Sequence, residues 1–398
     1  MTNAGRYQEI DALRGFALFG VLLVNLYSFG ADSPAWDESG DRLFWQVKHI
    51  FFESKFWGLF SLLFGISFWL QNREGTQFWR MCRRYLALMI FGLANALLFE
   101  GDILMLYAEL GIVLLVVHYL PDRALMTLAL ALFLIFPLAH WADAERGDSD
   151  SASSLMEARE WLAEDREEGL YSVGSLGDIV AEHAGYLPEV PWEDYQWPDS
   201  GWAVLAFFLV GLVLARRGVL AGVARAPTQL LRRGAGLMIA GLAIMALERF
   251  LALSIGYDVY GAALDNAALQ LAGDLIFLVG TLSLTAAWFC LVLGLAIQYR
   301  GSGLVSALES AGRMSLTVYF SQTLVFTTLF YGYGLGWAYQ LGPMAVSLLA
   351  VGIFTLQALF AHQWLRHFRL GPMEWLWRLA TDLRFPSARA APKPRRSH

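Results

Sequence analysis

The sequence contains few charged residues and almost no cysteine. Asp, Glu, Lys and Arg make up 16% of its 398 residues, whereas soluble domains have about a quarter. The two cysteines, Cys82 and Cys290, lie at the edge of an apolar run or inside one, which argues against a disulfide framework. No Cys or His residues have the spacing of a metal site, and no basic patch suits nucleic acid. We therefore expect neither a bound metal nor a nucleic-acid partner.

Several catalytic signatures are also missing. The sequence has no nucleophile elbow, no P-loop and no HExxH motif. Hydrophobic residues are abundant instead, at 57% of the chain, and the mean hydropathy is +0.47. No A-x-A-like cleavage site follows the first apolar run, so we interpret that run as a retained anchor. These features predict a protein embedded in a lipid bilayer.

Long apolar segments recur along the whole chain. A spanning helix needs about 20 mostly apolar residues, and ten segments approach this pattern. We predict an all-α, polytopic integral membrane bundle of about ten transmembrane helices. The segments are Leu13–Phe29, Phe51–Leu70, Arg84–Phe99, Ile103–Leu120, Ala124–Trp141, Gly201–Ala215, Ala235–Ile255, Leu269–Ile297, Leu308–Tyr331 and Pro343–Trp364.

Arginine is concentrated in alternate connections between these segments. Arginine clusters follow the second, sixth and tenth segments, within residues 73–84, 216–233 and 366–378. The intervening connections are acidic or neutral, as at residues 32–41 and 100–102. The positive-inside rule then predicts that both termini are cytoplasmic.

We predict one membrane-embedded domain over residues 1–382, followed by a disordered, basic cytoplasmic tail over residues 383–398. The acidic connection 143–199 is predicted to be an extracytoplasmic loop inserted between the fifth and sixth segments. It contains two predicted helices, one with Ser154 as a possible N-cap and a second within GSLGDIVAEHAGYLPEV. The loop is interpreted either as a cap over the outer mouth or as a solvated connection.

Ionisable side chains inside spanning segments cost about 3 kcal/mol each on insertion scales. They are therefore the best pointers to function, and we expect them to line a polar cavity. Arg14 would lie at its cytoplasmic side and the acids toward its outer side. The alternative is that charges near helix ends reach the interface, and that Asp11 and Arg14 form an anchoring salt bridge. The predicted cavity residues are Asp11, Arg14, Asn25, Asn95, Glu109, Asp274 and Gln322.

His49 has a carboxylate four residues later, at Glu53. On a helix, this spacing brings two side chains together. Histidine is the commonest general base, so we predict a catalytic group of His49 with Glu53 or Asp102. The alternative is an interfacial histidine with a purely structural role.

Six sequence blocks resemble those of a known family. The N-terminal block is IDALRGFALFGVLLVN, and KFWGLFSLLFG, GDILMLYAELG, GRMSLTVYFSQT, FYGYGLG and GPMEWLWR follow in order. Together they resemble the YeiB family of bacterial membrane proteins, the domain of unknown function 418 type. That family is similar to a wider group of transmembrane acyltransferases, which includes heparan-alpha-glucosaminide N-acetyltransferase-like proteins.

The resemblance implies a multi-pass protein of the bacterial inner (plasma) membrane. It also implies transfer of an acyl group from cytoplasmic acyl-CoA, as co-substrate, to a small-molecule or glycan acceptor at the extracytoplasmic face. No bound cofactor is predicted. Arg80, Arg83 and Arg84 would then bind the CoA phosphates. Asn95 and Gln322 would polarise a carbonyl group.

Two other function classes remain open. The first is a small-solute or ion-coupled transporter, in which Asp11, Glu109 and Asp274 would be proton or cation sites. The absence of a visible inverted repeat argues against it. The second is a membrane protein without catalytic turnover.

Overall fold

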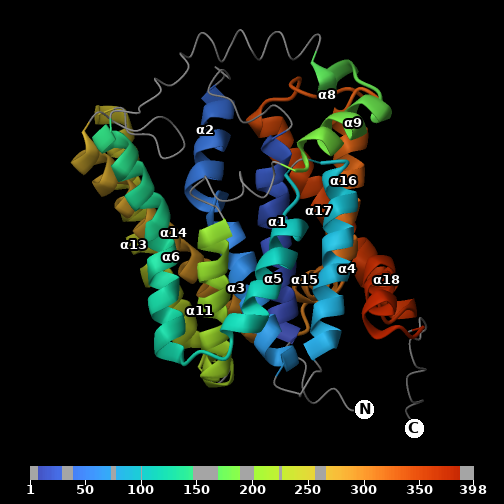
Figure 1. The fold of residues 1–398 in the computed structure, drawn as a ribbon, viewed down its shortest axis with the longest axis horizontal. Coiled ribbons are helices and arrows are strands. Elements are labelled where there is room, and N and C mark those ends of the chain that lie inside the picture. The colour runs from blue at the N-terminus through green and yellow to red at the C-terminus, as the bar shows by residue number, and fades with distance from the viewer. Residues whose placement is uncertain are drawn as a thin grey trace.

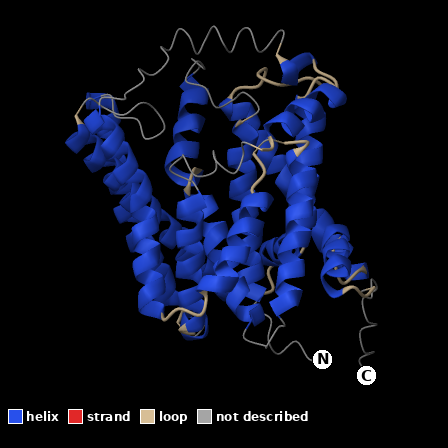
Figure 2. Cartoon of the chain, in the orientation of Figure 1, coloured by secondary structure: helices blue, strands red, loops and turns tan. Residues whose placement is uncertain are grey.

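The computed structural model is helical in every regular element of the residues that it describes (Figures 1 and 2). These residues are 8–28, 39–72, 78–99, 101–146, 169–188, 201–223, 226–255 and 266–385.

Six helical segments of the described chain are long and apolar enough to cross a membrane. They include α1 (Gln8–Tyr27), α6 (Asp122–Arg146) and α17 (Pro343–His367). The protein is therefore a polytopic helical membrane protein. Two of the other three segments are Pro227–Ala252, within α13 (Pro227–Ile255), and α14 (Ala267–Gln298). The third, Gly40–Asn72, spans nearly all of α2 (Ser39–Val47), then η1 (Lys48–Phe52) and α3 (Lys55–Asn72).

Each of the ten predicted segments contains a helix. Four of these helices are less apolar or shorter than the six above, because arginines lie near the start of α4 and glycines lie near the ends of the others. These helices are α4 (Phe78–Ala96), α5 (Leu104–Val117), α11 (Gly201–Arg216) and α16 (Ser315–Phe330). Two further short helices, α12 (Val219–Val223) and α18 (Pro372–Asp382), lie outside the predicted segments.

The ninth predicted segment, Leu308–Tyr331, is not one continuous helix. It is divided at Met314 between α15 (Gly303–Arg313) and α16, and Met314 adopts φ −107° and ψ 34°. The N–H of Met314 is shared between the carbonyls of Ser310 and Ala311, which closes α15. A side chain from α18 caps the first turn of α16, so a tertiary contact stabilises a helix start that the apolar pattern does not mark.

The centre of the bundle is α1, which packs against α3, α14, α15 and α17. Its apolar side chains, such as Leu13, Val21 and Leu22, are fully buried. The approach of α15 is close because both helices have a glycine at the crossing. A Cβ at Gly15 would overlap the carbonyl oxygen of Leu308, and one at Gly312 would overlap that of Asp11. Small residues at such crossings are the usual basis of helix packing in membranes.

The outer helices expose apolar side chains. Val116, Ile239 and Leu356 are each about 70% exposed, on α5, α13 and α17. In a soluble protein such a surface would favour aggregation, whereas here it is suited to lipid. The bilayer is therefore the direct partner of this protein.

Part of the connection 143–199 lies against the end of the bundle drawn uppermost in Figure 1. The predicted helix in this region is confirmed as α9 (Leu176–Tyr186), and Ser175 forms a capping box with Asp178. The short α8 (Leu170–Val173) docks through Tyr171, whose carbonyl accepts a 2.8 Å hydrogen bond from the N–H of Gly332. The helix predicted to begin near Ser154, and the tail beyond residue 385, lie outside the described residues.

Candidate functional site

His49 lies on η1, a single π-helical turn between α2 and α3. The turn ends at Phe52 with Glu53 as its C-cap, and the next residue, Ser54, has a left-handed backbone with φ 59°. A π-turn and a non-glycine residue in this region both cost energy, and both are frequent at functional sites. The chain thus breaks helical geometry where the predicted base is located.

The predicted pair of His49 and Glu53 is in contact. His49 Nδ1 lies 2.8 Å from Glu53 Oε2, and Lys48 Nζ lies 3.1 Å from Glu53 Oε1. Because a carboxylate accepts hydrogen bonds, this contact assigns a ring proton to Nδ1. The second ring nitrogen lies 3.8 Å from Glu248 Oε2, on α13. Glu248 is 1% exposed.

Buried charges of opposite sign gather around the imidazole. Lys55 is fully buried, donates from Nζ to the carbonyl oxygen of His49 at 3.0 Å, and lies 4.8 Å from the centre of the Phe277 ring. The ammonium groups of Lys48 and Lys55 and the carboxylates of Glu53 and Glu248 thus lie around the imidazole.

Aromatic rings enclose the imidazole. Trp45 is stacked on it, with ring centres 5.8 Å apart and planes within 3°. Phe277 lies on α14 with its ring centre 6.1 Å from that of His49. With His49 itself 4% exposed, these rings limit the access of water, which strengthens electrostatic interactions within the cluster.

A second histidine–carboxylate pair lies one helical turn from Phe277. Asp274, a predicted cavity residue, has its Oδ2 3.5 Å from His140 Nδ1 on α6. Gln270 donates from Nε2 to Asp274 Oδ1 at 3.1 Å. The sequence did not point to this pair, because Asp274 lies on a different helix from His140 and far from it in the chain. Lys48 and Gln270 were also missed. Lys48 lies five residues before Glu53, which is not the spacing of helical neighbours, whereas Gln270 lies four residues before Asp274, a spacing that could have identified it.

Asp102 belongs to a different cluster, in the connection between α4 and α5. Its carboxylate accepts hydrogen bonds from Asn95 Nδ2 at 2.8 Å and from the Tyr319 hydroxyl at 3.3 Å. The backbone N–H groups of Leu104 and Met105 also donate to it, so Asp102 caps α5. Burial raises the pKa of Asp102 to about 7, although these hydrogen bonds oppose the rise.

No hydrogen bond or ion pair among the described residues joins Asp102 to His49 or Glu53. Glu53 is therefore the carboxylate that the geometry gives to His49. Asn95 is likewise engaged by Asp102 and has no hydrogen bond to the His49 cluster.

The predicted pair of Asp11 and Arg14 is formed near the start of α1. Arg14 Nη1 donates to Asp11 Oδ1 at 2.8 Å, and Nη2 donates to Ser67 Oγ at 2.8 Å. The pair thus ties α1 to α3. Along α3, Ser67 and Lys55 are separated by twelve residues, which is roughly 18 Å at 1.5 Å per residue.

Aromatic side chains fill the core between these two levels. We call this group the aromatic layer. Its rings are in contact, with centre-to-centre distances from 5.0 to 6.3 Å. The layer consists of Phe16, Phe19, Phe52, Phe56 and Trp288.

The three arginines predicted to bind donor phosphates all contact α18. Arg80 Nε lies 2.8 Å from Asp382 Oδ1, and Arg83 Nε donates to the carbonyl of Thr381 at 3.0 Å. The Arg84 guanidinium lies over the Trp377 ring at 3.8 Å. The helix α18 therefore supplies part of the environment of these arginines.

The remaining predicted residues are dispersed. Asn25 is buried on α1, and Glu109 is half-buried on α5. Gln322 Nε2 donates to Gln357 Oε1 at 3.3 Å, between α16 and α17. No hydrogen bond among the described residues joins these three side chains to His49. In the same part of the chain, no three His, Cys, Asp or Glu side chains are placed to hold a metal ion.

Comparison with known proteins places this geometry in context. Residues 6–142 match the family described as heparan-alpha-glucosaminide N-acetyltransferase, catalytic. Residues 214–384 match the family described as protein of unknown function (DUF418). The chain is 29% identical to the uncharacterized protein YxaH of Bacillus subtilis, with 96% of each chain covered. It is 28% identical to the uncharacterized protein YeiB of Escherichia coli, with 94% of this chain and 96% of the relative covered.

The chain is a distant homologue of YeiB and YxaH over nearly its full length. The resemblance predicted from the sequence blocks is thus confirmed. No solved structure matches the chain. The His49 cluster draws on both matched regions, because His49 and Glu53 lie in the first, and Glu248 and Phe277 lie in the second.

Proposed function

We propose that this protein is an integral-membrane acyltransferase with His49 as its general base. It would transfer an acetyl-like group from acyl-CoA to a small-molecule or glycan acceptor. The observation that carries the proposal is the 2.8 Å contact between His49 Nδ1 and Glu53. It lies within the region that matches the catalytic part of an N-acetyltransferase family.

In the proposed reaction, Glu53 holds the proton on Nδ1, and the lone pair on Nε2 takes a proton from the acceptor O–H or N–H. The acceptor oxygen or nitrogen then forms a bond to the thioester carbon, and the carbon–sulfur bond breaks. CoA leaves as a thiolate, which receives the proton from the imidazolium. The buried setting of His49 would limit competing hydrolysis of the thioester.

We further propose ten membrane crossings with both termini cytoplasmic, in a bacterial inner membrane. Residues 143–199 would then be extracytoplasmic, and the basic tail 383–398 cytoplasmic. The alternating arginine clusters support this orientation. In addition, α1 begins, and α18 lies, toward the same lower end of the bundle (Figure 1).

The donor would bind with its phosphates near Arg14, Arg80 and Arg84. Mutual repulsion among these guanidinium groups favours a bound polyanion. The thioester would then have to reach His49, roughly 18 Å further along α3. The aromatic layer lies between the two levels, so transfer requires its rings to move apart.

Release of CoA from acetyl-CoA by the purified protein in lipid nanodiscs tests the proposal. The assay would include a panel of amine and sugar acceptors. General-base catalysis contributes about 10²–10⁴-fold, so we expect His49→Ala to lower kcat by at least a hundredfold. Glu53→Gln should lower kcat by a smaller factor, because the imidazole remains but its tautomer is no longer fixed.

His367→Ala is the matched control, since His367 is exposed at the end of α17 and contacts the carbonyl of Gln363. It should retain wild-type activity. Absence of CoA release with every acceptor would contradict the proposal. Proton-coupled solute uptake in proteoliposomes that survives His49→Ala would instead favour a transporter.

A further inference from the structure

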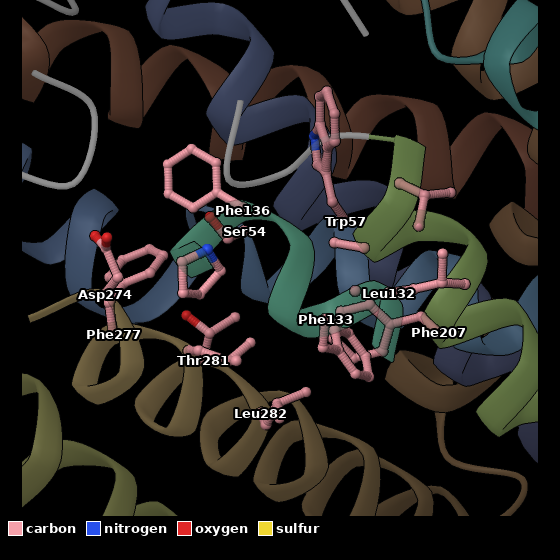
Figure 3. A pocket seen from close by; sticks show the side chains of 15 residues that line it. Ser54, Trp57, Leu132, Phe133, Phe136, Phe207, Asp274, Phe277, Thr281 and Leu282 are labelled. Carbon is pink, nitrogen blue, oxygen red and sulfur yellow. The ribbon is translucent and has the colours of Figure 1, made fainter. Parts of the chain in front are cut away.

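A cavity of about 40 Å³ lies beside the His49 cluster, between α3, α6, α11 and α14 (Figure 3). Most of its wall is aromatic or aliphatic, including Phe133, Phe136 and Phe207. One wall is shared with the candidate site, because Phe277 lines the cavity and also packs against His49. The cavity is therefore one aromatic ring away from the proposed base.

Two buried hydrogen-bonding groups in this cavity have no partner in the described part of the chain. They are the hydroxyl of Thr281 and the indole N–H of Trp57. Thr281 is 6% exposed, and an unsatisfied buried polar group costs about 1–3 kcal/mol. Figure 3 shows these side chains on different sides of the cavity, Thr281 from α14 and Trp57 from α3. The hydroxyl of Thr281 can donate to a ligand atom inside the cavity.

The charge at the edge of the cavity restricts which ligands suit it. Asp274 lines it, and its carboxylate is held by Gln270 and His140. A buried carboxylate would repel a free fatty-acid anion. The walls favour a small, uncharged group with an apolar end and a hydrogen-bond acceptor.

We propose that the cavity binds the short acyl group of the donor. Its carbonyl oxygen would accept a hydrogen bond from the hydroxyl of Thr281, and its alkyl end would contact Phe133 and Phe136. This donor would also polarise the carbonyl for attack. This inference rests on the proposed function, and it adds the length of the acyl chain that the protein accepts.

The size of the cavity limits that length. One buried water molecule requires a cavity volume of about 10–15 Å³. The cavity of about 40 Å³ therefore accommodates roughly three non-hydrogen atoms. An acetyl group has three, and a propionyl group has four. Acetyl should therefore be preferred, and chains of six carbons should be excluded.

The test compares acetyl-, propionyl-, butyryl- and hexanoyl-CoA with variants that change the cavity. Phe136→Ala enlarges it and should raise the ratio of hexanoyl to acetyl kcat/KM at least tenfold. Ala203→Leu fills it and should lower acetyl-CoA turnover at least tenfold. Thr281→Val keeps the shape but removes the hydroxyl, and should lower kcat for every chain length. Phe360→Ala, an exposed aromatic truncation on α17, should change none of these values.

A second measurement does not depend on turnover. N-methylacetamide carries an acetyl group of three non-hydrogen atoms, and its binding can be followed by saturation-transfer ¹H NMR with the protein in nanodiscs. We expect saturable binding to the wild type that is lost in Ala203→Leu, with both proteins matched for thermal unfolding midpoint.

The two proposals fail in different ways. Saturable probe binding without any CoA release would overturn the acyltransferase proposal and keep the cavity as an acyl site. CoA release with the same chain-length profile in wild type, Phe136→Ala and Ala203→Leu would overturn the cavity inference alone. Absence of probe binding in the wild type would also overturn it.

Discussion

Thr317 and Glu374 are joined by a 2.6 Å hydrogen bond between the hydroxyl and Oε2, although they lie on different helices. Oε1 of the same carboxylate accepts hydrogen bonds from the backbone N–H groups of Leu316 and Thr317. These N–H groups belong to the first turn of α16 and have no partner within the helix. Glu374 on α18 thus provides the cap that α16 lacks in its own sequence, and it holds α18 against the bundle.

Loss of this cap should destabilise the protein. Removing a helix cap costs about 0.5–2 kcal/mol, so Glu374→Ala should lower the thermal unfolding midpoint in detergent and increase proteolysis after α18. Glu145→Ala is the control, because Glu145 is exposed near the end of α6. Equal midpoints for the two variants would contradict the capping role.

Ionisation of Asp102 should make stability depend on pH. Burial raises its pKa from 3.8 to about 7, so between these values the folded protein binds more protons than the unfolded chain. Stability must then fall as pH rises from about 4 to about 7. Burial also raises the pKa of Glu374, which acts in the same direction.

Asp102→Asn should flatten this dependence, since the amide can still accept from Leu104 and Met105 but cannot ionise. Thermal unfolding midpoints from pH 4.5 to 8 provide the measurement. We expect a smaller decline in the variant than in the wild type. An equal or steeper decline in the variant would show that Asp102 is not the group responsible.

The crossing of α1 and α15 should not tolerate a methyl group. A Cβ at Gly15 would overlap the carbonyl oxygen of Leu308, which is backbone and cannot rotate away. Gly15→Ala should therefore lower the unfolding midpoint and the yield of monodisperse protein. Gly352 on α17 has no atom within 4 Å of the corresponding position. Gly352→Ala should be neutral or stabilising, because alanine is favoured over glycine in a helix by about 1 kcal/mol.

Under the proposed function, substitutions of Arg80 and of Asp382 should change the KM for acetyl-CoA in opposite directions. Arg80→Gln removes a positive charge and should raise the KM for acetyl-CoA several-fold without changing kcat. Asp382→Asn removes the carboxylate 2.8 Å from Arg80 Nε. A partly exposed ion pair is worth about 0.2–1 kcal/mol, so freeing Arg80 should lower KM by up to about fivefold.

Steady-state kinetics at two salt concentrations would check both changes. High salt should reduce the difference between the variants, because it screens exposed charges. Equal KM values for wild type, Arg80→Gln and Asp382→Asn at low salt would exclude Arg80 from donor binding.

Features that depend on nearby residues were predictable from the sequence. The apolar runs located a helix in each of ten segments, since a spanning helix must satisfy its own backbone hydrogen bonds. The spacing of His49 and Glu53, and of Asp11 and Arg14, also predicted their contacts correctly, because one helical turn brings such residues together.

Other assignments depended on packing between helices. The sequence offered both Glu53 and Asp102 as partners of His49, and only the folded chain separates them, by placing Asp102 at the start of α5. The break at Met314 was missed for the same reason, since the cap of α16 comes from α18.

The sequence by itself determined that the chain is a helical membrane protein, that it resembles YeiB, and that its histidine–carboxylate pair lies on one turn. These properties follow from composition and from contacts within about four residues. The tertiary structure alone decided that Glu248 lies beside His49 and that His140 contacts Asp274. It also decided that Trp57 and Thr281 line the same cavity. These residues are far apart in the sequence, and their meeting depends on how the side chains of α3, α6, α13 and α14 pack.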